Sequence, residues 1–364
     1  MAQERGRPEP APSIMPKPRL LIVDDSVVIR RALTAAITRE SGVAVAGSAS
    51  DGRVALMKIP LLHPDVVALD VDMPDMDGLE TLTAIRQIYP RLPVIMLSVP
   101  TSRGAAVTVD ALTLGASDYV TKPAAAVPSD DELRILGDEL ISKIAGCFPN
   151  VLRERRHDAT RVARRIDVLA IGLSTGGPQA LMDLIPTLPA DFPVPILIVQ
   201  HMPPVFTKLL AERLNANARI AVAEGSMYQA LAPGHAWVAP GEFHMAVERD
   251  GDAVRIVTHQ KAAENSCRPA VDVLFRAVAQ VYGPHALAVV MTGMGQDGLR
   301  GCEQIRAAGG QVLVQDEESA VVWGMPGNVA RAGMADQILP LSELGSEILD
   351  RAWRDRRRPL VAVV

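Results

Sequence analysis

The stretch RLLIVDDSVVIRRAL, residues 19–33, is a short apolar run followed by two aspartates and an amphipathic segment. This is the pattern of a buried strand, a loop and a helix. The alternation returns four more times, with strands expected at 43–47, 65–70, 93–97 and 118–121 and a last helix from about 129 to 147. Five such units in about 130 residues predict a flavodoxin-like doubly wound α/β domain over residues 19–147.

A second alternating series follows in the other half of the chain. Strands are expected at 166–172, 194–200, 286–293 and 311–315, with helical stretches between them. The middle of this half, from about 220 to 258, is punctuated by Gly and Pro and is rich in β-forming residues. The pattern predicts a doubly wound α/β domain with a β-hairpin insertion, over residues 166–358.

Three segments fall outside these two predicted domains. Residues 1–18 contain five prolines and no apolar run, so they are expected to be a flexible leader, and residues 359–364 form a short tail. Residues 148–165 include RERRHDATRVARR, with six arginines and two acids, and are interpreted as an interdomain linker. A charged extension of the preceding helix fits that segment about equally well.

Composition excludes several functional classes. A chain of 364 residues with 48% hydrophobic residues exceeds the size of one core and predicts two domains. A net charge of -5 and 3% aromatic residues offer neither a basic surface nor stacking platforms, so nucleic acid is not expected as a partner. The three cysteines lack paired spacing, which disfavours disulfides and zinc and fits the cytoplasm. No apolar run is long enough to span a membrane, so no membrane insertion is expected.

Acidic and hydroxyl residues end the predicted strands of the first domain. Asp24 and Asp25 follow the first strand, Asp70 ends the third, Ser98 follows the fourth, and Lys122 follows the fifth. Ligands bind at these strand ends in doubly wound sheets. Three carboxylates in one site repel each other unless a cation lies among them, and oxygen ligands suit Mg²⁺. Taken singly, each residue is better explained as a helix cap, a turn residue or a surface side chain. Taken together, at consecutive strand ends, they predict a magnesium site with a carboxylate able to accept a phosphoryl group.

The motifs VDDS (23–26), LDVDMPDMDGLE (69–80) and TKP (121–123), with Ser98, resemble those of response-regulator receiver domains. The resemblance implies that Asp70 is the phosphoacceptor. It also implies a Mg²⁺ site, a hydroxyl and an aromatic switch residue, and a lysine that pairs with the phosphoryl group. Asp24, Asp25 and Asp70, with the backbone carbonyl of Asp72, would bind Mg²⁺. Ser98 would be the switch hydroxyl and Tyr119 the aromatic switch residue, and Lys122 would pair with the phosphoryl group.

In the second domain, DVLAIGLSTGGPQALMDLI (167–185) is an apolar strand, a Gly-x-Ser-x-Gly turn and a helix opened by Pro178. Such a turn presents the hydroxyl of Ser174 at a sheet edge, beside the free N–H groups of a helix N-terminus. A phosphate-binding loop has the same pattern, so the turn alone does not decide between them. A serine nucleophile also requires a base.

His201 follows the strand 194–200 directly, which places it at the strand end next to Ser174. The other six histidines are expected at the surface, at helix caps or in the β-rich middle. Asp297 follows the strand 286–293 and could orient the imidazole. The glycines at 293 and 295 let backbone N–H groups face the same cleft, as an oxyanion hole requires. The chain order Ser, His, Asp differs from the order in α/β-hydrolases.

The blocks GLSTGGPQAL, PVPILIVQHMPPVFTKLLAERL, LAPGHAWVAPGEFH, RPAVDVLF, TGMGQDG and QDEESAVVWGMP resemble those of the chemotaxis protein-glutamate methylesterases. The resemblance covers nearly the whole chain. It implies Ser174 as nucleophile, His201 as general base and Asp297 as its orienter, the N–H of Met294 in the oxyanion hole, and Thr175 and Arg268 as flanking residues. Two departures are SVPTSRG (98–104), where relatives commonly have a second serine, and Ala270, where a serine is usual.

The resemblance therefore implies a phosphorylation-activated serine hydrolase that demethylates glutamate methyl esters on chemoreceptors, releases methanol, and also deamidates receptor glutamines. It implies Mg²⁺ in the receiver domain and no cofactor in the hydrolase domain. The implied partners are methylated chemoreceptors and a histidine kinase of the chemotaxis type, with the unphosphorylated receiver covering the catalytic cleft. A receiver-controlled binding effector without hydrolase activity is the alternative. A transcriptional regulator would need a basic recognition helix, and the second domain has none.

Overall fold

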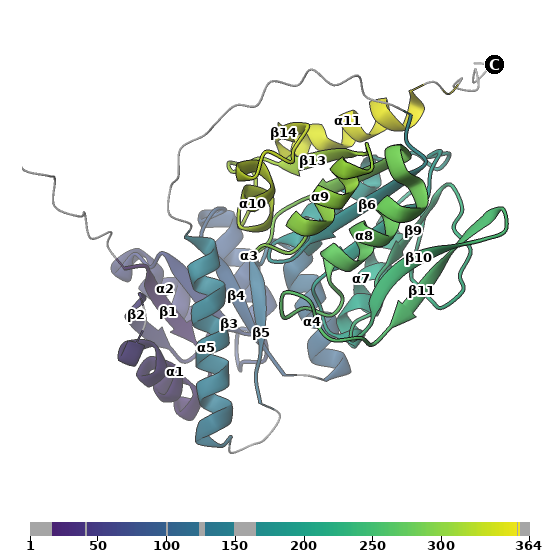
Figure 1. The fold of residues 1–364 in the computed structure, drawn as a ribbon. Coiled ribbons are helices and arrows are strands. Elements are labelled where there is room, and N and C mark those ends of the chain that lie inside the picture. Colours follow the sequence, from purple (N-terminus) through teal and green to yellow (C-terminus); the bar gives the residue numbers. More distant parts are fainter. Residues whose placement is uncertain are drawn as a thin grey trace, which may run out of the picture.

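The computed structural model describes residues 17–40, 42–99, 101–123, 128–148, 165–354 and 356. They form two parallel α/β units side by side, the first drawn in purple and blue and the second in green and yellow (Figure 1). The predicted leader, linker and tail lie almost wholly outside the described residues. No helix of the described part is long and apolar enough to cross a membrane.

The first unit is a five-stranded parallel sheet in the order β2-β1-β3-β4-β5. Its elements alternate strictly, as the sequence predicts. They are β1 (Arg19–Val23), α1 (Val27–Glu40), β2 (Ala44–Ala49), α2 (Gly52–Leu62), β3 (Val66–Asp70), α3 (Gly78–Ile88), β4 (Val94–Ser98), α4 (Ser102–Thr113), β5 (Asp118–Thr121) and α5 (Asp130–Cys147).

Local sequence signals determine where these helices begin. Asp77 and Glu80 form a capping box at α3, and Ser129 and Glu132 form another at α5. The strands β3 and β4 are buried along their whole length. Helices α1 and α5 therefore cover one face of the sheet, while α2, α3 and α4 cover the other.

The second unit is a seven-stranded parallel sheet in the order β14-β13-β12-β6-β7-β9-β8, with a separate two-stranded hairpin. Helices α6, α7 and α11 cover one face, and α8, α9 and α10 cover the other. The strands are β6 (Val168–Leu173), β7 (Ile196–Gln200), β8 (Ala221–Glu224), β9 (His235–Val238), β10 (His244–Asp250), β11 (Ala253–His259), β12 (Ala286–Val290), β13 (Gln311–Gln315) and β14 (Gln337–Leu339). The helices are α6 (Gly177–Leu184), η1 (Ile185–Thr187), α7 (Pro204–Asn217), α8 (Val271–Tyr282), η2 (Gly283–His285), α9 (Leu299–Ala307), α10 (Met325–Arg331) and α11 (Leu341–Trp353).

The predicted fold class is confirmed, and the structure adds detail to the β-rich middle. Only β10 and β11 form an antiparallel hairpin, whereas β8 and β9 extend the main sheet in parallel. Each of these two strands has four residues, too few for a periodic pattern to separate them from the hairpin. The short strand β14 was also not predicted.

The two units share one continuous apolar layer. Helix α4 of the first unit packs against α6 and α7 of the second. Buried residues of α4, such as Val109 and Leu112, belong to the same hydrophobic cluster as Phe206 and Leu210 of α7. The carboxyl ends of β6, β7 and β12 therefore lie near the first unit.

A substitution at Gly172 in β6 tests how closely this strand packs against helix α8. A Cβ atom there would lie 2.4 Å from Cγ1 of Val271, at the start of α8. We expect Gly172→Ala to lower the free energy of unfolding by about 1 to 3 kcal/mol. The three tryptophans all lie in the second unit, so urea unfolding followed by tryptophan fluorescence measures this loss. Gly42→Ala is the control, because nothing lies within 4 Å of its added carbon; an equal effect of both changes would contradict the packing argument.

Candidate active site

The acidic cluster of the first unit lies at the carboxyl ends of β1 and β3. Asp24 and Asp70 are buried and Asp25 is exposed, and the three can each offer an oxygen within 4.8 Å of the others. Lys122 Nζ lies 2.6 Å from Asp70 Oδ2 and 3.1 Å from Asp24 Oδ2. Lys122 thus pairs with two of the three carboxylates. Burial and the charge of Asp24 raise the pKa of Asp70 to about 7, although Lys122 opposes the rise.

Two residues expected near this cluster make other contacts. The hydroxyl of Ser98 is buried at the end of β4, accepts a hydrogen bond from Thr108 Oγ1 at 2.7 Å, and donates to the carbonyl of Gly104. Tyr119 is buried in β5, and its ring stacks on Phe206 of α7 with centroids 4.8 Å apart. Tyr119, which the sequence resemblance assigns as the aromatic switch residue, thus contacts the second unit directly. The carbonyl of Asp72 stays a predicted ligand.

Ser174 follows β6 in a tight turn before α6. Its N–H donates to the carbonyl of Thr292 at 3.0 Å, and its carbonyl accepts from Gln200 Nε2 at 2.9 Å. A Cβ at Gly293 would lie 2.9 Å from Ser174 Cβ, so only glycine allows the loop after β12 to approach this closely. At Gly176 the backbone has a φ of 77°, which also favours glycine. The turn is thereby held between β7 and β12.

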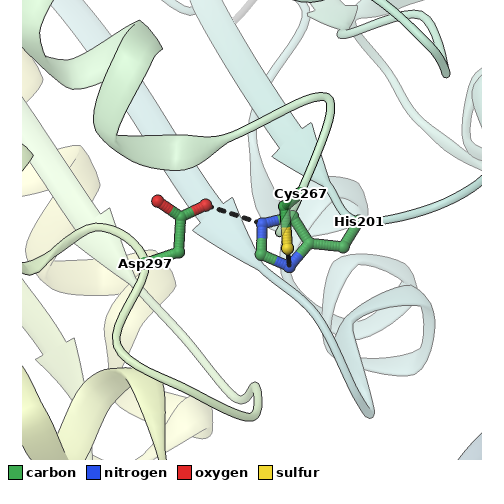
Figure 2. Close-up of side chains that lie close together, drawn as sticks. All are labelled: His201, Cys267 and Asp297. Carbon is green, nitrogen blue, oxygen red and sulfur yellow. Dashed lines mark hydrogen bonds and ion pairs between the residues drawn. The ribbon is translucent and has the colours of Figure 1, made fainter. Parts of the chain in front are cut away.

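His201 and Asp297 form a hydrogen-bonded pair beside this turn. His201 Nε2 lies 2.8 Å from Asp297 Oδ2, and both side chains are largely buried (Figure 2). They come from the loops after β7 and β12, the two strands that flank β6. The sequence placed both residues at these strand ends, and the structure brings them together.

Asp297 is fixed by further donors. Its two oxygens accept hydrogen bonds from the N–H groups of Val271 and Asp272 and from Asn265 Nδ2. Burial raises the pKa of Asp297, but the hydrogen bond and charge of His201 and the N–H groups of Asp272 and Val271 outweigh it and lower the pKa. Burial and the charge of Asp297 raise the pKa of Asp272 instead. Asp297 is therefore the ionised partner of His201.

The second ring nitrogen of His201 contacts a cysteine. Nδ1 lies 3.5 Å from Cys267 Sγ, and no hydrogen bond of the described residues joins Ser174 Oγ to His201. Cys267 and Asp297 contact opposite nitrogens of one ring (Figure 2). The three side chains also lie close enough together to hold a metal ion. Burial lowers the pKa of His201, but Asp297 and Cys267 outweigh it and raise the value to about 9.

The sequence analysis did not single out Cys267, Asn265 or Asp272. All three follow the hairpin, more than sixty positions beyond His201, and no spacing rule brings that loop back to β7. A cysteine two residues before a proline is also a weak signal by itself. Arg268 was expected to flank the site; its guanidinium pairs with Glu242 Oε2 at 2.9 Å and with loop carbonyls.

Two side chains of the first unit contact residues beside this site. Thr175, next to Ser174, is buried and donates a hydrogen bond to Asp118 of β5, which also pairs with Lys143 of α5 at 2.8 Å. Met294 Sδ accepts from Ser142 of α5 at 3.9 Å. Two residues that the sequence assigned to the catalytic cleft thus contact the first unit.

Residues 169–348 match the family model of the CheB methylesterase, and residues 20–129 match that of the response regulator receiver domain. A protein-glutamate methylesterase/protein-glutamine glutaminase of Trichodesmium erythraeum is 52% identical, over 93% of this chain and 99% of that protein. One from a Nocardioides species is 44% identical, over 94% and 97%. The CheB methylesterase catalytic domain of Thermotoga maritima, a crystal structure, is 39% identical with a TM-score of 0.50, covering 51% of this chain and 98% of that one.

The raised pKa of His201 gives a direct spectroscopic prediction. In an NMR titration, the ring nitrogens of His201 should change protonation near pH 9, whereas His259, whose pKa burial lowers, should titrate below its usual value of about 6.5. Asp297→Asn removes the charge that favours the imidazolium and should move the His201 midpoint to lower pH. A His201 midpoint at or below that of His259 would refute this account of the site.

Proposed function

The chain belongs to the CheB methylesterase family, and from this premise we propose which residues carry out and control its reaction. It is a protein-glutamate methylesterase/protein-glutamine glutaminase that a receiver domain regulates, and its role is chemotaxis adaptation. The alternative of a binding effector without hydrolase activity is therefore not retained. We take the receiver domain as residues 19–147, the linker as 148–165 and the catalytic domain as 166–358.

We assign the nucleophile to Ser174. Its Oγ attacks the carbonyl carbon of a glutamate methyl ester, and His201 takes the hydroxyl proton. The tetrahedral oxyanion is stabilised by backbone N–H groups, of which Met294 is the proposed donor. Collapse breaks the bond to the methoxy group, which leaves as methanol with the proton from His201. Water then hydrolyses the glutamyl–Ser174 ester, and a glutamine substrate releases ammonia by the same steps.

The bond between His201 and Asp297 carries this assignment. Because Asp297 is ionised and holds Nε2, the ring keeps one orientation and its cation is stabilised while the oxyanion develops. Nδ1 is then the nitrogen available for the serine proton. Since the pKa of His201 is about 9 and Nδ1 contacts Cys267, the ring has to release its Nδ1 proton and exchange Cys267 for Ser174 before it acts as the base.

The acidic cluster fits Mg²⁺ by its donor set, because three carboxylates can each offer an oxygen within 4.8 Å of the others and Lys122 pairs with only two of them. Asp24, Asp25 and Asp70 would hold the ion, which would neutralise an incoming phosphoryl group. We propose Asp70 as the phosphoacceptor, a chemotaxis-type histidine kinase as the donor and methylated chemoreceptors as substrates. The proposed location is the cytoplasm, where receptor signalling domains and the kinase meet.

Phosphorylation would act through β5. This strand begins at Asp118, which binds Thr175 beside the nucleophile, and ends just before Lys122, which pairs with Asp70. A phosphoryl group adds about two negative charges, and each charge-assisted hydrogen bond is worth about 1.5 to 3 kcal/mol. Capture of Lys122 and Ser98 could thus shift a closed–open equilibrium by about a hundredfold. We infer that the unphosphorylated receiver covers the catalytic cleft and that phosphorylation uncovers it.

Ser174→Ala tests the nucleophile. Without the hydroxyl no acyl-enzyme forms, and methanol release from methylated receptor should fall by about 10⁶-fold. The assay compares wild type, Ser174→Ala and Asp70→Asn, with and without a small phosphodonor and Mg²⁺. Asp70→Asn should keep basal release and lose the activation. Substantial release by Ser174→Ala would exclude the proposed triad.

Removal of the ring stack between Tyr119 and Phe206 tests whether this contact stabilises the closed state of the unphosphorylated protein. Such a pair contributes about 0.5 to 1.5 kcal/mol beyond its buried area, so Phe206→Ala should raise the activity of the unphosphorylated protein by about 2- to 10-fold. Val205→Ala is the matched control, because Val205 neighbours Phe206 but its side chain is half exposed. If Phe206→Ala leaves basal activity at the level of this control, the ring stack does not hold the receiver closed.

A further inference from the structure

Cys267 lies in contact with the histidine of the proposed triad. Its Sγ is 3.5 Å from His201 Nδ1, and the opposite ring nitrogen is bonded to Asp297 (Figure 2). The thiol is free and partly accessible, unlike the buried thiol of Cys302. A histidine that contacts a cysteine and is itself hydrogen-bonded to a carboxylate is an arrangement that activates a thiol nucleophile.

A tight turn holds Cys267 in this position. The backbones of Glu264 and Cys267 exchange two hydrogen bonds, of 2.9 and 3.2 Å, across Asn265 and Ser266. Both central residues have positive φ, 52° and 61°, although neither is glycine. Such backbone strain persists only where the surroundings fix it. Here Asn265 Nδ2 bonds to Asp297 Oδ1 and to Asp272 Oδ2, each at 2.9 Å. The turn that carries the thiol is thus anchored to the same carboxylate that orients the histidine.

Two cationic side chains, His201 and Lys143, interact with the sulfur. The raised pKa of His201 keeps its imidazole protonated at neutral pH. Lys143 of α5 lies close enough that the charge of Cys267 contributes, after Asp118 and Glu139, to raising the pKa of its ammonium group against burial. Neighbouring cations stabilise a thiolate, the form that reacts with electrophiles. Burial raises the pKa of the Cys147 thiol to about 12 and that of the Cys302 thiol well above its usual value, which disfavours the thiolate at those two positions.

We propose that Cys267 is a nucleophilic thiol activated by His201 and Asp297, and that its oxidation by a hydroperoxide is a reversible off-switch for the esterase. The thiolate attacks one peroxide oxygen, an S–O bond forms and the O–O bond breaks. With hydrogen peroxide, the departing hydroxide takes the proton of the His201 imidazolium and leaves as water. Sulfur loses two electrons to the peroxide and becomes a sulfenic acid. Two equivalents of a small thiol return it to the thiol, with water and the disulfide of that reductant as products.

Oxidation of Cys267 would inhibit the esterase because of where the modified sulfur lies. The sulfenic acid occupies the space at Nδ1, the nitrogen that has to receive the proton of Ser174. This consequence rests on the proposed function, whereas the reactivity of the thiol does not. The two parts are therefore measured separately.

The thiol is tested in full-length protein carrying Ser174→Ala, so that no esterase chemistry contributes. Hydrogen peroxide is added, and sulfenic acid is trapped with dimedone and located by peptide mass spectrometry. Cys267 should react at least about tenfold faster than Cys147 or Cys302. His201→Gln should slow it by about tenfold or more, and Asp297→Asn should slow it to a lesser degree. Thermal unfolding of each variant identifies any that has lost its fold. A Cys267 rate unaffected by both substitutions in folded protein would overturn the proposal.

The switch is tested by methanol release from methylated receptor with wild type and Cys267→Ser. Peroxide should lower wild-type release by at least about tenfold, dithiothreitol should restore it, and Cys267→Ser should keep its own starting rate. Equal peroxide inhibition of both proteins would refute the switch. If neither protein releases methanol while the thiol rate still depends on His201, the proposed function fails and the activated thiol stands.

Discussion

The hydrogen bond between His201 Nε2 and Asp297 Oδ2 is the interaction on which the site depends. It crosses from the loop after β7 to the loop after β12, over the strand that presents Ser174. The bond fixes one ring nitrogen to a carboxylate and leaves the other to face a reacting group. It also sets the charge of the site, since Asp297 and Cys267 keep the imidazole protonated against the effect of burial. Parallel strand order is what makes the bond possible, because it brings three distant loops to one sheet edge.

The position of strand β5 explains how the receiver can control the hydrolase. Strand β5 is short, and its two ends face different sites. Asp118 at one end holds Thr175 beside the nucleophile, and Lys122 just past the other end pairs with Asp70. In the proposed mechanism, a charge added at Asp70 therefore has to act over only a few residues. The ring of Tyr119, the proposed switch residue, lies between these ends and packs on the second unit, within the apolar layer that the two units share.

The sequence was sufficient for those features that repeat or that end a strand. Five alternating units predict the first sheet, and strand-end positions alone bring out Asp24, Asp70, His201 and Asp297. Features that depend on tertiary contacts between loops far apart in the sequence could not be predicted in this way. Cys267 reaches His201 only because the turn at 264–267 folds back onto Asp297, and β8 and β9 join the main sheet although four residues carry no clear period. The contact of Met294 with α5 likewise follows from how the two units pack.

The central claim is that Ser174 is activated by the His201–Asp297 pair and covered by the receiver until Asp70 is phosphorylated. The most direct measurement is the rate at which a fluorophosphonate probe labels Ser174 in the full-length protein, before and after addition of a phosphodonor and Mg²⁺. The account predicts labelling at Ser174 that becomes several-fold faster on phosphorylation and stays slow in Asp70→Asn. Labelling at another residue, or an equal rate in both states, would contradict it.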